Sequence, residues 1–304
     1  MQKMLDALVE KHKEITKLGK LADYIPELKK ANPDDLGIFI LDNEGSEYFA
    51  GQYDTKFTVQ SISKVVALML AILDNGEEYV FSKVGMDPSG DPFNSIRKLE
   101  TSSRRKPYNP MINAGAIVVS SMIKGNDAKH KFERLLEFFK LITEDPTLEL
   151  NSKVYLSESE TGNKNRAMGY YMKAEGLITG NVEEALEVYF KQCSIDVTAK
   201  TIARLGLFLA NEGQNSKKEE IISPRVSRIV KTLMVTCGMY DNSGEFAVRV
   251  GLPSKSGVGG GIVSVVPHKM GIGIYSPSLD IKGNPIAGIT LLEDLCNQLK
   301  CRIF

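Results

Sequence analysis

The chain has 304 residues, with 38 basic and 38 acidic side chains, and 42% of its residues are hydrophobic. This balance is typical of a folded globular protein and argues against disorder, and the net charge of zero gives no reason to expect a nucleic acid or an anionic membrane as partner. The longest apolar run, Val65 to Leu73, has nine residues, far fewer than the roughly 20 that a membrane span needs.

The first 76 residues are predicted to form a helix, a two-stranded hairpin and a second helix, at 2–17, 37–41 with 48–52, and 61–76. The hairpin turn would be Asp42-Asn43-Glu44-Gly45, a composition typical of tight turns. Because the first helix is amphipathic and contains Asp6 and Glu10, it does not resemble a signal peptide. We therefore expect a cytoplasmic protein.

The middle of the chain has a helical pattern, and its end returns to strands. Apolar residues recur with the helical period at 114–123, 131–142, 165–173, 182–191, 198–209 and 225–236. Strands are then predicted at 245–250, 262–266 and 270–275, followed by a closing helix at 286–299. We predict a single α/β domain, 1–304. An antiparallel sheet from N- and C-terminal strands, flanked by helices, would form one lobe (1–76 and 236–304), with an inserted helical lobe (77–235).

Cysteine and histidine show no metal-binding pattern. The four cysteines include no C-x-x-C pair, and a disulfide framework is not expected at this chain length. Structural or surface roles are expected for the three histidines, His12, His130 and His268. If the protein is an enzyme, its general base is therefore expected to be another residue type.

A serine three residues before a lysine places both side chains on one face of a helix, where the amine can reach the hydroxyl. The pattern occurs four times, at Ser61/Lys64, Ser95/Lys98, Ser103/Lys106 and Ser121/Lys124. Lys64 alone opens an apolar helix, where burial and the positive helix end favour a neutral amine. Ser61 could then be a nucleophile that also offers its backbone N–H to an oxyanion. The alternative is that Ser61 is a helix cap and Lys64 a surface lysine.

A second motif adds weight to the first pair. Lys255-Ser256-Gly257 is the one K-[ST]-G in the chain, and a glycine-rich strand follows it. Serine β-lactamases and penicillin-binding proteins combine S-x-x-K on a helix with K-[ST]-G on an edge strand, in this order. Their third motif, S-x-N, is absent, but Tyr240-Asp241-Asn242 fits the Y-x-N form of some members. Tyr240 could relay a proton, because a phenol both donates and accepts hydrogen bonds.

Longer blocks resemble the serine-dependent glutaminases, which share the β-lactamase-like fold. The blocks are GKLADYIPELKKA (19–31), QSISKV (60–65), NPMINAGAI (109–117), SESETGNKNRAMGYY (157–171), YFKQCSI (189–195), CGMYDNSGEFA (237–247) and GLPSKSGVGGGI (251–262). They cover nearly the whole chain in the family's order, so the chain is identified as a member. It lacks the long N-terminal extension and the ankyrin repeats of animal members, and therefore resembles a stand-alone bacterial-type enzyme.

The resemblance implies a function and a role for each matching residue. The protein would hydrolyse the side-chain amide of L-glutamine through a Ser61 acyl-enzyme, with Lys64 as base and Tyr240 as a further catalytic residue. The positions that match the family's glutamine contacts are Ser61, Asn113, Glu158, Asn165, Tyr189, Tyr240 and Val258, the last through its backbone, and Tyr24 matches a pocket-lining tyrosine. No metal or organic cofactor is implied. Because family members are often oligomeric, we expect a homo-oligomer, a dimer or a tetramer.

Two other functions remain open at this stage. One is a β-lactamase or peptidase that acts on acyl-D-Ala substrates, against which stand the absent S-x-N and the absent export signal. The other is a non-catalytic sensor of glutamine, against which stands the intact set of Ser61, Lys64 and Tyr240.

Overall fold

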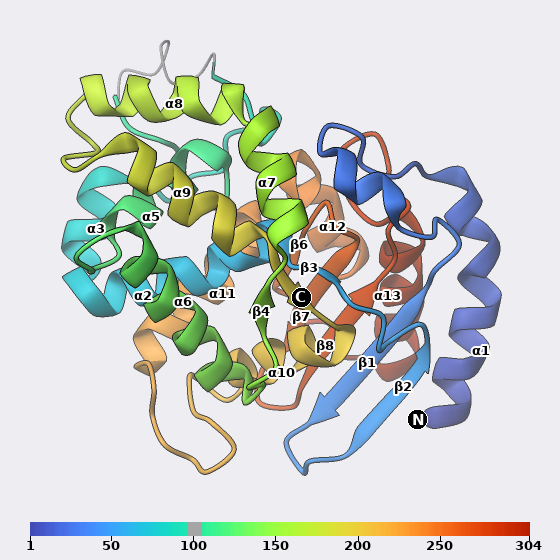
Figure 1. The fold of residues 1–304 in the computed structure, drawn as a ribbon. Coiled ribbons are helices and arrows are strands. Elements are labelled where there is room, and N and C mark those ends of the chain that lie inside the picture. Colours follow the sequence, from blue (N-terminus) through green and yellow to red (C-terminus); the bar gives the residue numbers. More distant parts are fainter. Residues whose placement is uncertain (97–104) are drawn as a thin grey trace.

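The computed structural model describes residues 1–96 and 105–304. Its centre is a five-stranded antiparallel sheet, in the order β2-β1-β8-β7-β6, built from the two ends of the chain (Figure 1). The strands are β1 (Gly37–Asp42), β2 (Glu47–Gly51), β6 (Ser254–Ser256), β7 (Gly261–Val266) and β8 (Met270–Tyr275). In register, Ile40 lies opposite Tyr48 on one side and Ile272 on the other. The predicted hairpin and the predicted sheet of N- and C-terminal strands are confirmed.

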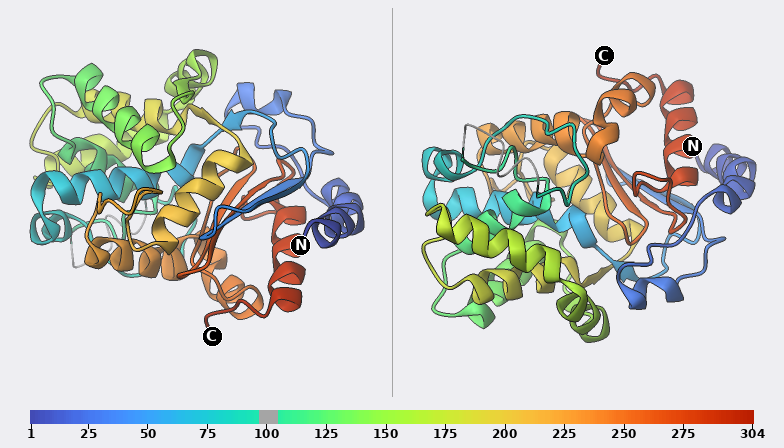
Figure 2. Two further views of the ribbon diagram at one scale, coloured as in Figure 1. Left: turned by 90° about the horizontal axis from the view of Figure 1, so that it is seen from below. Right: turned by 90° about the horizontal axis from the view of Figure 1, so that it is seen from above.

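Successive residues of the central strands face two different helical layers. Ile38, Ile40 and Ile274 belong to the core that includes α1 (Gln2–His12) and α13 (Ile286–Leu299). Phe39 and Val263 face the opposite core, which includes α10 (Ala199–Ala210). Seen from below, the sheet lies between α10 and the pair α1 and α13 (Figure 2). Helices therefore cover both faces of the sheet. The helix α10, on one of these faces, lies within 77–235, the range that was predicted to form the helical lobe.

A second lobe of helices lies beside the sheet (Figure 1). Its helices are α2 (Ser63–Asn75), α3 (Glu77–Lys83), α5 (Asn113–Met122), α6 (Ala128–Thr143), α7 (Ser152–Thr161), α8 (Asn163–Ala174), α9 (Val182–Cys193) and α11 (Pro224–Cys237). Helix α2 is the central one, because all ten of its residues from Ser63 to Ile72 are buried. A small antiparallel sheet of β3 (Phe57–Thr58), β5 (Ile195–Val197) and β4 (Glu149–Leu150) connects α2 with α7 and α9.

Some predicted elements differ from the structure. Residues 245–250, predicted to be a strand, lie largely in helix α12 (Ser243–Arg249). Phe246 and Val250 are buried, whereas Val248 is 80% exposed, so the apolar pattern is that of positions i and i+4 rather than of alternation. The predicted first helix ends at His12 and continues as a 3-10 helix, Lys13–Leu18. Among the described residues, none of the helices is long and apolar enough to span a membrane.

Candidate active site

Ser61 lies at an abrupt change from strand to helix. Strand β3 leads through Val59 into a 3-10 helix, Gln60–Ile62, that runs on into α2. Gln60 has a φ of 47°, a left-handed conformation that costs a residue with a side chain about 1–3 kcal/mol. This turn puts Ser61 at the start of a helical stretch, where backbone N–H groups point outward and the helix dipole is positive. Ser61 is 7% exposed.

Lys64 lies in the first turn of α2 and is almost completely buried. Its Nζ donates to Asn113 Oδ1 (2.7 Å) and to the Met111 carbonyl oxygen (3.2 Å). Burial lowers the pKa of the Lys64 ammonium to about 8, against the opposing effects of Cys193 and Glu158. A substantial fraction of this amine is therefore neutral near pH 8, as a general base requires.

The remaining Ser-x-x-Lys pairs differ from this one. Lys98 and Ser103, each half of a pair, lie outside the described residues. In the fourth pair, Lys124 is exposed to solvent. Two pairs lie wholly within the described residues, and of their two lysines Lys64 is the buried one.

The K-S-G segment approaches Ser61 from the edge strand β6. A Cβ atom on Gly257 would lie 2.7 Å from the Val59 oxygen and 3.3 Å from the Ser61 nitrogen, and one on Gly259 would lie 2.4 Å from the Thr58 oxygen. Glycine is therefore required for the end of β6 to pack against residues 58–61. Within the described parts of the chain, the backbone N–H groups of Ser61 and Val258 find no protein acceptor. Two such donors are what a developing oxyanion needs.

Tyr240 reaches the same place from the other side of the K-S-G segment. It begins a 3-10 helix, Tyr240–Asn242, and has a φ of 56°, a second strained backbone at the site. Its hydroxyl donates to the Ser256 carbonyl oxygen at 3.4 Å. Burial raises the pKa of the Tyr240 phenol, and hydrogen bonds with Ser61 and Ser256 act in the opposite direction. The phenol is thus protonated at neutral pH and lies within hydrogen-bonding reach of the Ser61 hydroxyl.

The helical lobe supplies a buried carboxyl group. Glu158, on α7, is 6% exposed, and its Oε2 has no hydrogen-bond partner. Burial raises the pKa of Glu158 to about 8, although the charge of Lys64 and a hydrogen bond from Gln60 lower it. A buried, unpartnered carboxyl oxygen is unfavourable unless a cation or a donor completes the site. Glu158 therefore marks a position at which a positively charged group of a ligand would be stabilised.

Polar and aromatic side chains of neighbouring elements surround this carboxyl group. Asn113, which accepts from Lys64, donates through Nδ2 to Asn165 Oδ1 at 3.0 Å. Tyr189 is 2% exposed, and the Lys64 Nζ lies 5.9 Å from its ring centroid. Desolvation of the hydroxyl, and then the charge of Glu158, raise the pKa of the Tyr24 phenol, although half of that side chain is exposed. The structure thus brings all of the predicted site residues to one region.

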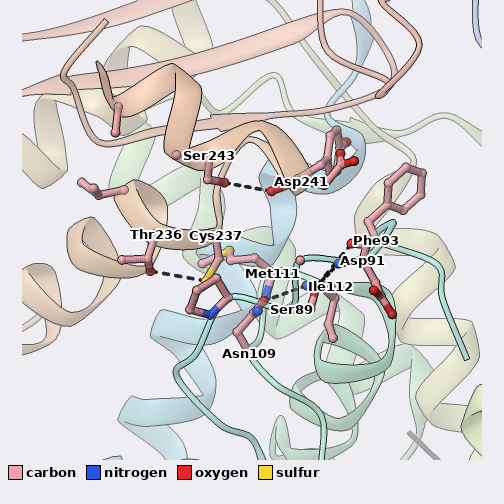
Figure 3. A pocket seen from close by; sticks show the side chains of 16 residues that line it. Ser89, Asp91, Phe93, Asn109, Met111, Ile112, Thr236, Cys237, Asp241 and Ser243 are labelled. Carbon is pink, nitrogen blue, oxygen red and sulfur yellow. Dashed lines mark hydrogen bonds between the residues drawn. The ribbon is translucent and has the colours of Figure 1, made fainter. Parts of the chain in front are cut away.

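Two cavities border the site and share Phe93 and Asp241 as wall residues. One, of about 540 Å³, is lined by Tyr24 and Val258. The other, of about 400 Å³, lies against Tyr240 and Met111, below α12 (Figure 3). Among the described residues, no group of three or more His, Cys, Asp or Glu side chains is arranged to hold a metal ion.

Two residues with a clear structural role at the site were not predicted. Gln60 sets the turn before Ser61, and only its place inside the block QSISKV could have suggested a role. Phe93 packs against Tyr240 with ring centroids 4.6 Å apart and a tilt of 38°, and its carbonyl oxygen accepts from the Asn113 backbone N–H. Phe93 lies in a polar, irregular segment, which gave no signal at the level of sequence.

Comparison with known proteins assigns the family. A family profile described as Glutaminase matches residues 19–304. A glutaminase of Fusobacterium nucleatum is 67% identical over 304 residues, which are all of this chain and all of that protein. The chain belongs to the glutaminase family. The crystal structure of a probable glutaminase from Bacillus subtilis is 38% identical, with a TM-score of 0.94, and the match covers 100% of this chain and 97% of that one.

A further solved glutaminase carries information about chemistry. The Bacillus subtilis glutaminase in covalent complex with 5-oxo-L-norleucine, formed by reaction with 6-diazo-5-oxo-L-norleucine, is also 38% identical. Its TM-score is 0.92, and the match covers 100% of this chain and 99% of that one. The bacterial glutaminases have the β-lactamase-like fold, so the predicted fold class and the predicted enzyme family are both confirmed.

Proposed function

We propose that this chain hydrolyses the side-chain amide of L-glutamine to L-glutamate and ammonia through an acyl-enzyme on Ser61. The observation that carries the proposal is the pairing of Ser61 with a buried lysine one helical turn later, whose pKa lies near 8. A hydroxyl and a partly neutral amine on one helix face form a nucleophile and its base. The two backbone N–H groups without acceptors beside Ser61 support the same reaction.

The reaction begins when Lys64 takes the Ser61 proton and the hydroxyl oxygen attacks the amide carbon. The N–H groups of Ser61 and Val258 hold the oxyanion, each donor contributing about 3–4 kcal/mol. The C–N bond then breaks and its electron pair goes to nitrogen, which receives a proton from Tyr240 or Lys64. If Tyr240 is the donor, its phenolate regains a proton from the Lys64 ammonium, which had received it from Ser61. Ammonia leaves, and a water molecule hydrolyses the γ-glutamyl ester by the same steps in reverse. The chemistry requires no metal or organic cofactor.

Recognition of a free amino acid follows from the charges at the site. Glu158 binds the α-ammonium of glutamine, which supplies the cation that its unpartnered oxygen lacks. Asn165 and Tyr189 are neutral donors, suited to the α-carboxylate, and Asn113 lies between Asn165 and Lys64. Tyr24 closes the pocket at its exposed side.

The covalent adduct of the Bacillus subtilis glutaminase supports a covalent mechanism. The compound used there has the glutamine skeleton, with a diazomethyl group in place of the amide nitrogen, and its 5-oxo group remains in the adduct, so it reports a nucleophile that reaches the position next to the carbonyl carbon. By analogy with the family, we further propose that this protein acts in the cytoplasm as a homo-oligomer, without a nucleic acid or membrane partner.

The deciding experiment is an assay of ammonia released from L-glutamine by the purified protein, with nitrocefin hydrolysis measured in parallel. Ammonia release that depends on Ser61 would support the proposal. Nitrocefin turnover without ammonia would favour a β-lactam or peptide substrate, and binding of glutamine without turnover would favour a sensor.

A further inference from the structure

Asn109, in the segment that precedes α5, is a buried side chain to which the proposed mechanism above assigns no task. Its Oδ1 accepts from the backbone N–H groups of Met111 (3.0 Å) and Ile112 (3.1 Å), and its Nδ2 donates to the Asp87 carbonyl oxygen (2.8 Å) (Figure 3). Because Pro110 has no N–H, these are the two backbone donors between Asn109 and α5. One side-chain oxygen therefore holds both of them.

The hydrogen bond from Ile112 fixes the direction of the Met111 carbonyl group. The Ile112 N–H and the Met111 carbonyl belong to one planar trans peptide unit, so they point in opposite directions. With the N–H held by Asn109 Oδ1, the carbonyl oxygen points away from that side chain, and it accepts from Lys64 Nζ at 3.2 Å. This peptide unit therefore connects the asparagine with the lysine that serves as base in the proposed mechanism.

The acceptors at Lys64 decide where its lone pair can point. Its Nζ donates to the Met111 carbonyl oxygen and, at 2.7 Å, to Asn113 Oδ1. A neutral amine has two N–H groups and one lone pair, so these two acceptors use both N–H groups. The lone pair is left for the Ser61 hydroxyl, one helical turn earlier. If the Met111 carbonyl moved, the amine could rotate and turn its lone pair away from Ser61.

We propose that Asn109 is a positioning residue, which acts through the Met111 carbonyl group and keeps the lone pair of Lys64 directed at Ser61. The inference rests on the proposed function, in which Lys64 takes the Ser61 proton. Asn113 differs from Asn109, because it contacts Lys64 directly and matches one of the family's glutamine contacts. The effect of Asn109 passes through a backbone peptide unit, and its replacement leaves the side chains that contact Lys64 unchanged.

The test uses the dependence of kcat on pH, so the charges around Lys64 must be known. Among the described residues, the titratable groups that lie around it are Glu158 on α7, Tyr189 and Cys193 on α9, and Lys255 on β6. Asn109 is uncharged, so its replacement leaves all of these groups in place. A carbonyl acceptor favours the ammonium form of a lysine. A change in the apparent pKa of Lys64 would therefore report its hydrogen bond with Met111.

Asn109→Ala removes the acceptor, while the backbone stays packed on α5, since a Cβ atom on Gly115 would lie 1.9 Å from the Asn109 carbonyl oxygen. On the alkaline plateau, kcat for L-glutamine should fall about 10- to 100-fold, a part of the ~10²–10⁴ that a general base contributes. The midpoint of the rise of kcat with pH should move down by about 0.5–1 unit, because the ammonium form loses an acceptor. KM should change less than about threefold, because Asn109 lies outside the predicted glutamine contacts.

Two further variants separate this role from a general effect on the fold. In Asn109→Ser, the hydroxyl can accept from the same N–H groups, although more weakly, so kcat should fall less than about threefold. Asn215→Ala is the matched control, because Asn215 is also buried and its Oδ1 also accepts from two backbone N–H groups, those of Lys217 and Glu219. Asn215 lines a cavity beside the β1–β2 turn, so its replacement should change neither kcat nor the midpoint.

An Asn109→Ala variant whose midpoint stays unchanged or rises would refute the role of Asn109. An Asn109→Ser variant that loses as much activity as Asn109→Ala would refute it as well. If Asn109→Ala does not fold, Asn109→Leu, which has a similar shape and no acceptor, takes its place, and failure of both to fold would assign Asn109 to the fold and refute the inference. A wild-type protein that releases no ammonia would contradict the proposed function, and the inference would fall with it.

Discussion

Replacing Glu158 by glutamine should change stability and activity in opposite directions. Burial raises the pKa of this carboxyl from 4.5 to about 8 in the folded protein without ligand. Below pH 4.5 both states bind the proton and the shift has no cost. As pH rises from 4.5 to 8, only the unfolded state releases the proton, so the folded state is progressively disfavoured.

The size of the effect follows from the two pKa values. At pH 7 the shift costs about 1.4 kcal/mol for each of the 2.5 pH units above 4.5, or roughly 3 kcal/mol, and at pH 5 less than about 1 kcal/mol. A glutamine never ionises, so Glu158→Gln should regain this free energy of unfolding. For a chain of this length, 3 kcal/mol corresponds to a rise in Tm of about 5 °C. The gain should almost vanish at pH 5.

The same substitution should damage catalysis, because the α-ammonium of glutamine would lose its partner. An unpaired buried charge costs about 3–5 kcal/mol, which corresponds to a fall in kcat/KM of roughly 100- to 4,000-fold. N-acetyl-glutamine, which has no ammonium group, should be a poor substrate for the wild type. In the variant, the difference in kcat/KM between glutamine and N-acetyl-glutamine should be smaller.

The assays are thermal unfolding at pH 5 and pH 7, and kcat/KM for both substrates. Glu160→Gln is the matched control, since Glu160 lies on the same helix but is exposed, and it should change neither quantity. A Glu158→Gln variant that loses stability together with activity would mean that the carboxyl group serves the fold. If the ratio of kcat/KM for glutamine to kcat/KM for N-acetyl-glutamine is the same in the variant and the wild type, the α-ammonium binds elsewhere.

Three further predictions concern the chemistry. Ser61→Ala should lower kcat by several orders of magnitude with little change in Tm, and more than about a tenth of the activity remaining would exclude the acyl-enzyme. In the proposed mechanism Lys64 acts as a neutral amine, so kcat should rise with pH through an apparent pKa near 8, and Lys64→Arg should be almost inactive, since guanidinium stays charged in proteins; an active Arg variant would remove Lys64 from this role. Gly257→Ala should lower kcat at least about 100-fold, because the new methyl group would push the end of β6 away from Val59 and Ser61, whereas Gly244→Ala, with open space around it, should keep wild-type kcat; similar kcat values for the two variants would contradict this account of the close approach.

Sequence reasoning succeeded where one physical signal dominated. The closing helix was predicted with the bounds that α13 has, because an apolar period of 3.6 runs without a break from Ile286 to Leu299. Helix α7 was not predicted, because in its polar sequence only Val154 and Glu158 are buried. The strands β3, β4 and β5 have two or three residues each, too few to show any period.

The site residues also divide into those that a local sequence pattern predicted and those that it did not. Ser61 and Lys64 were candidates from spacing and from the apolar helix that follows them, whereas Glu158, Asn165 and Tyr189 entered only through the resemblance to a family. The left-handed backbone of Gln60 and the packing of Phe93 on Tyr240 depend on tertiary contacts. A local sequence pattern contains no information about such contacts.

The pairing of β1 with β8 has a consequence for the synthesis of the protein. Strand β1 leaves the ribosome early, but its partner β8 begins at Met270, so some 230 residues separate the two strands. Contacts this distant form slowly, and until they form, the apolar faces of β1 and β2 lack their cover. The nascent chain therefore depends on protection from aggregation until its last tenth is made. It also remains inactive until then, because the strand that completes the sheet holds β7 and β6, and with them the amide of Val258, against Ser61.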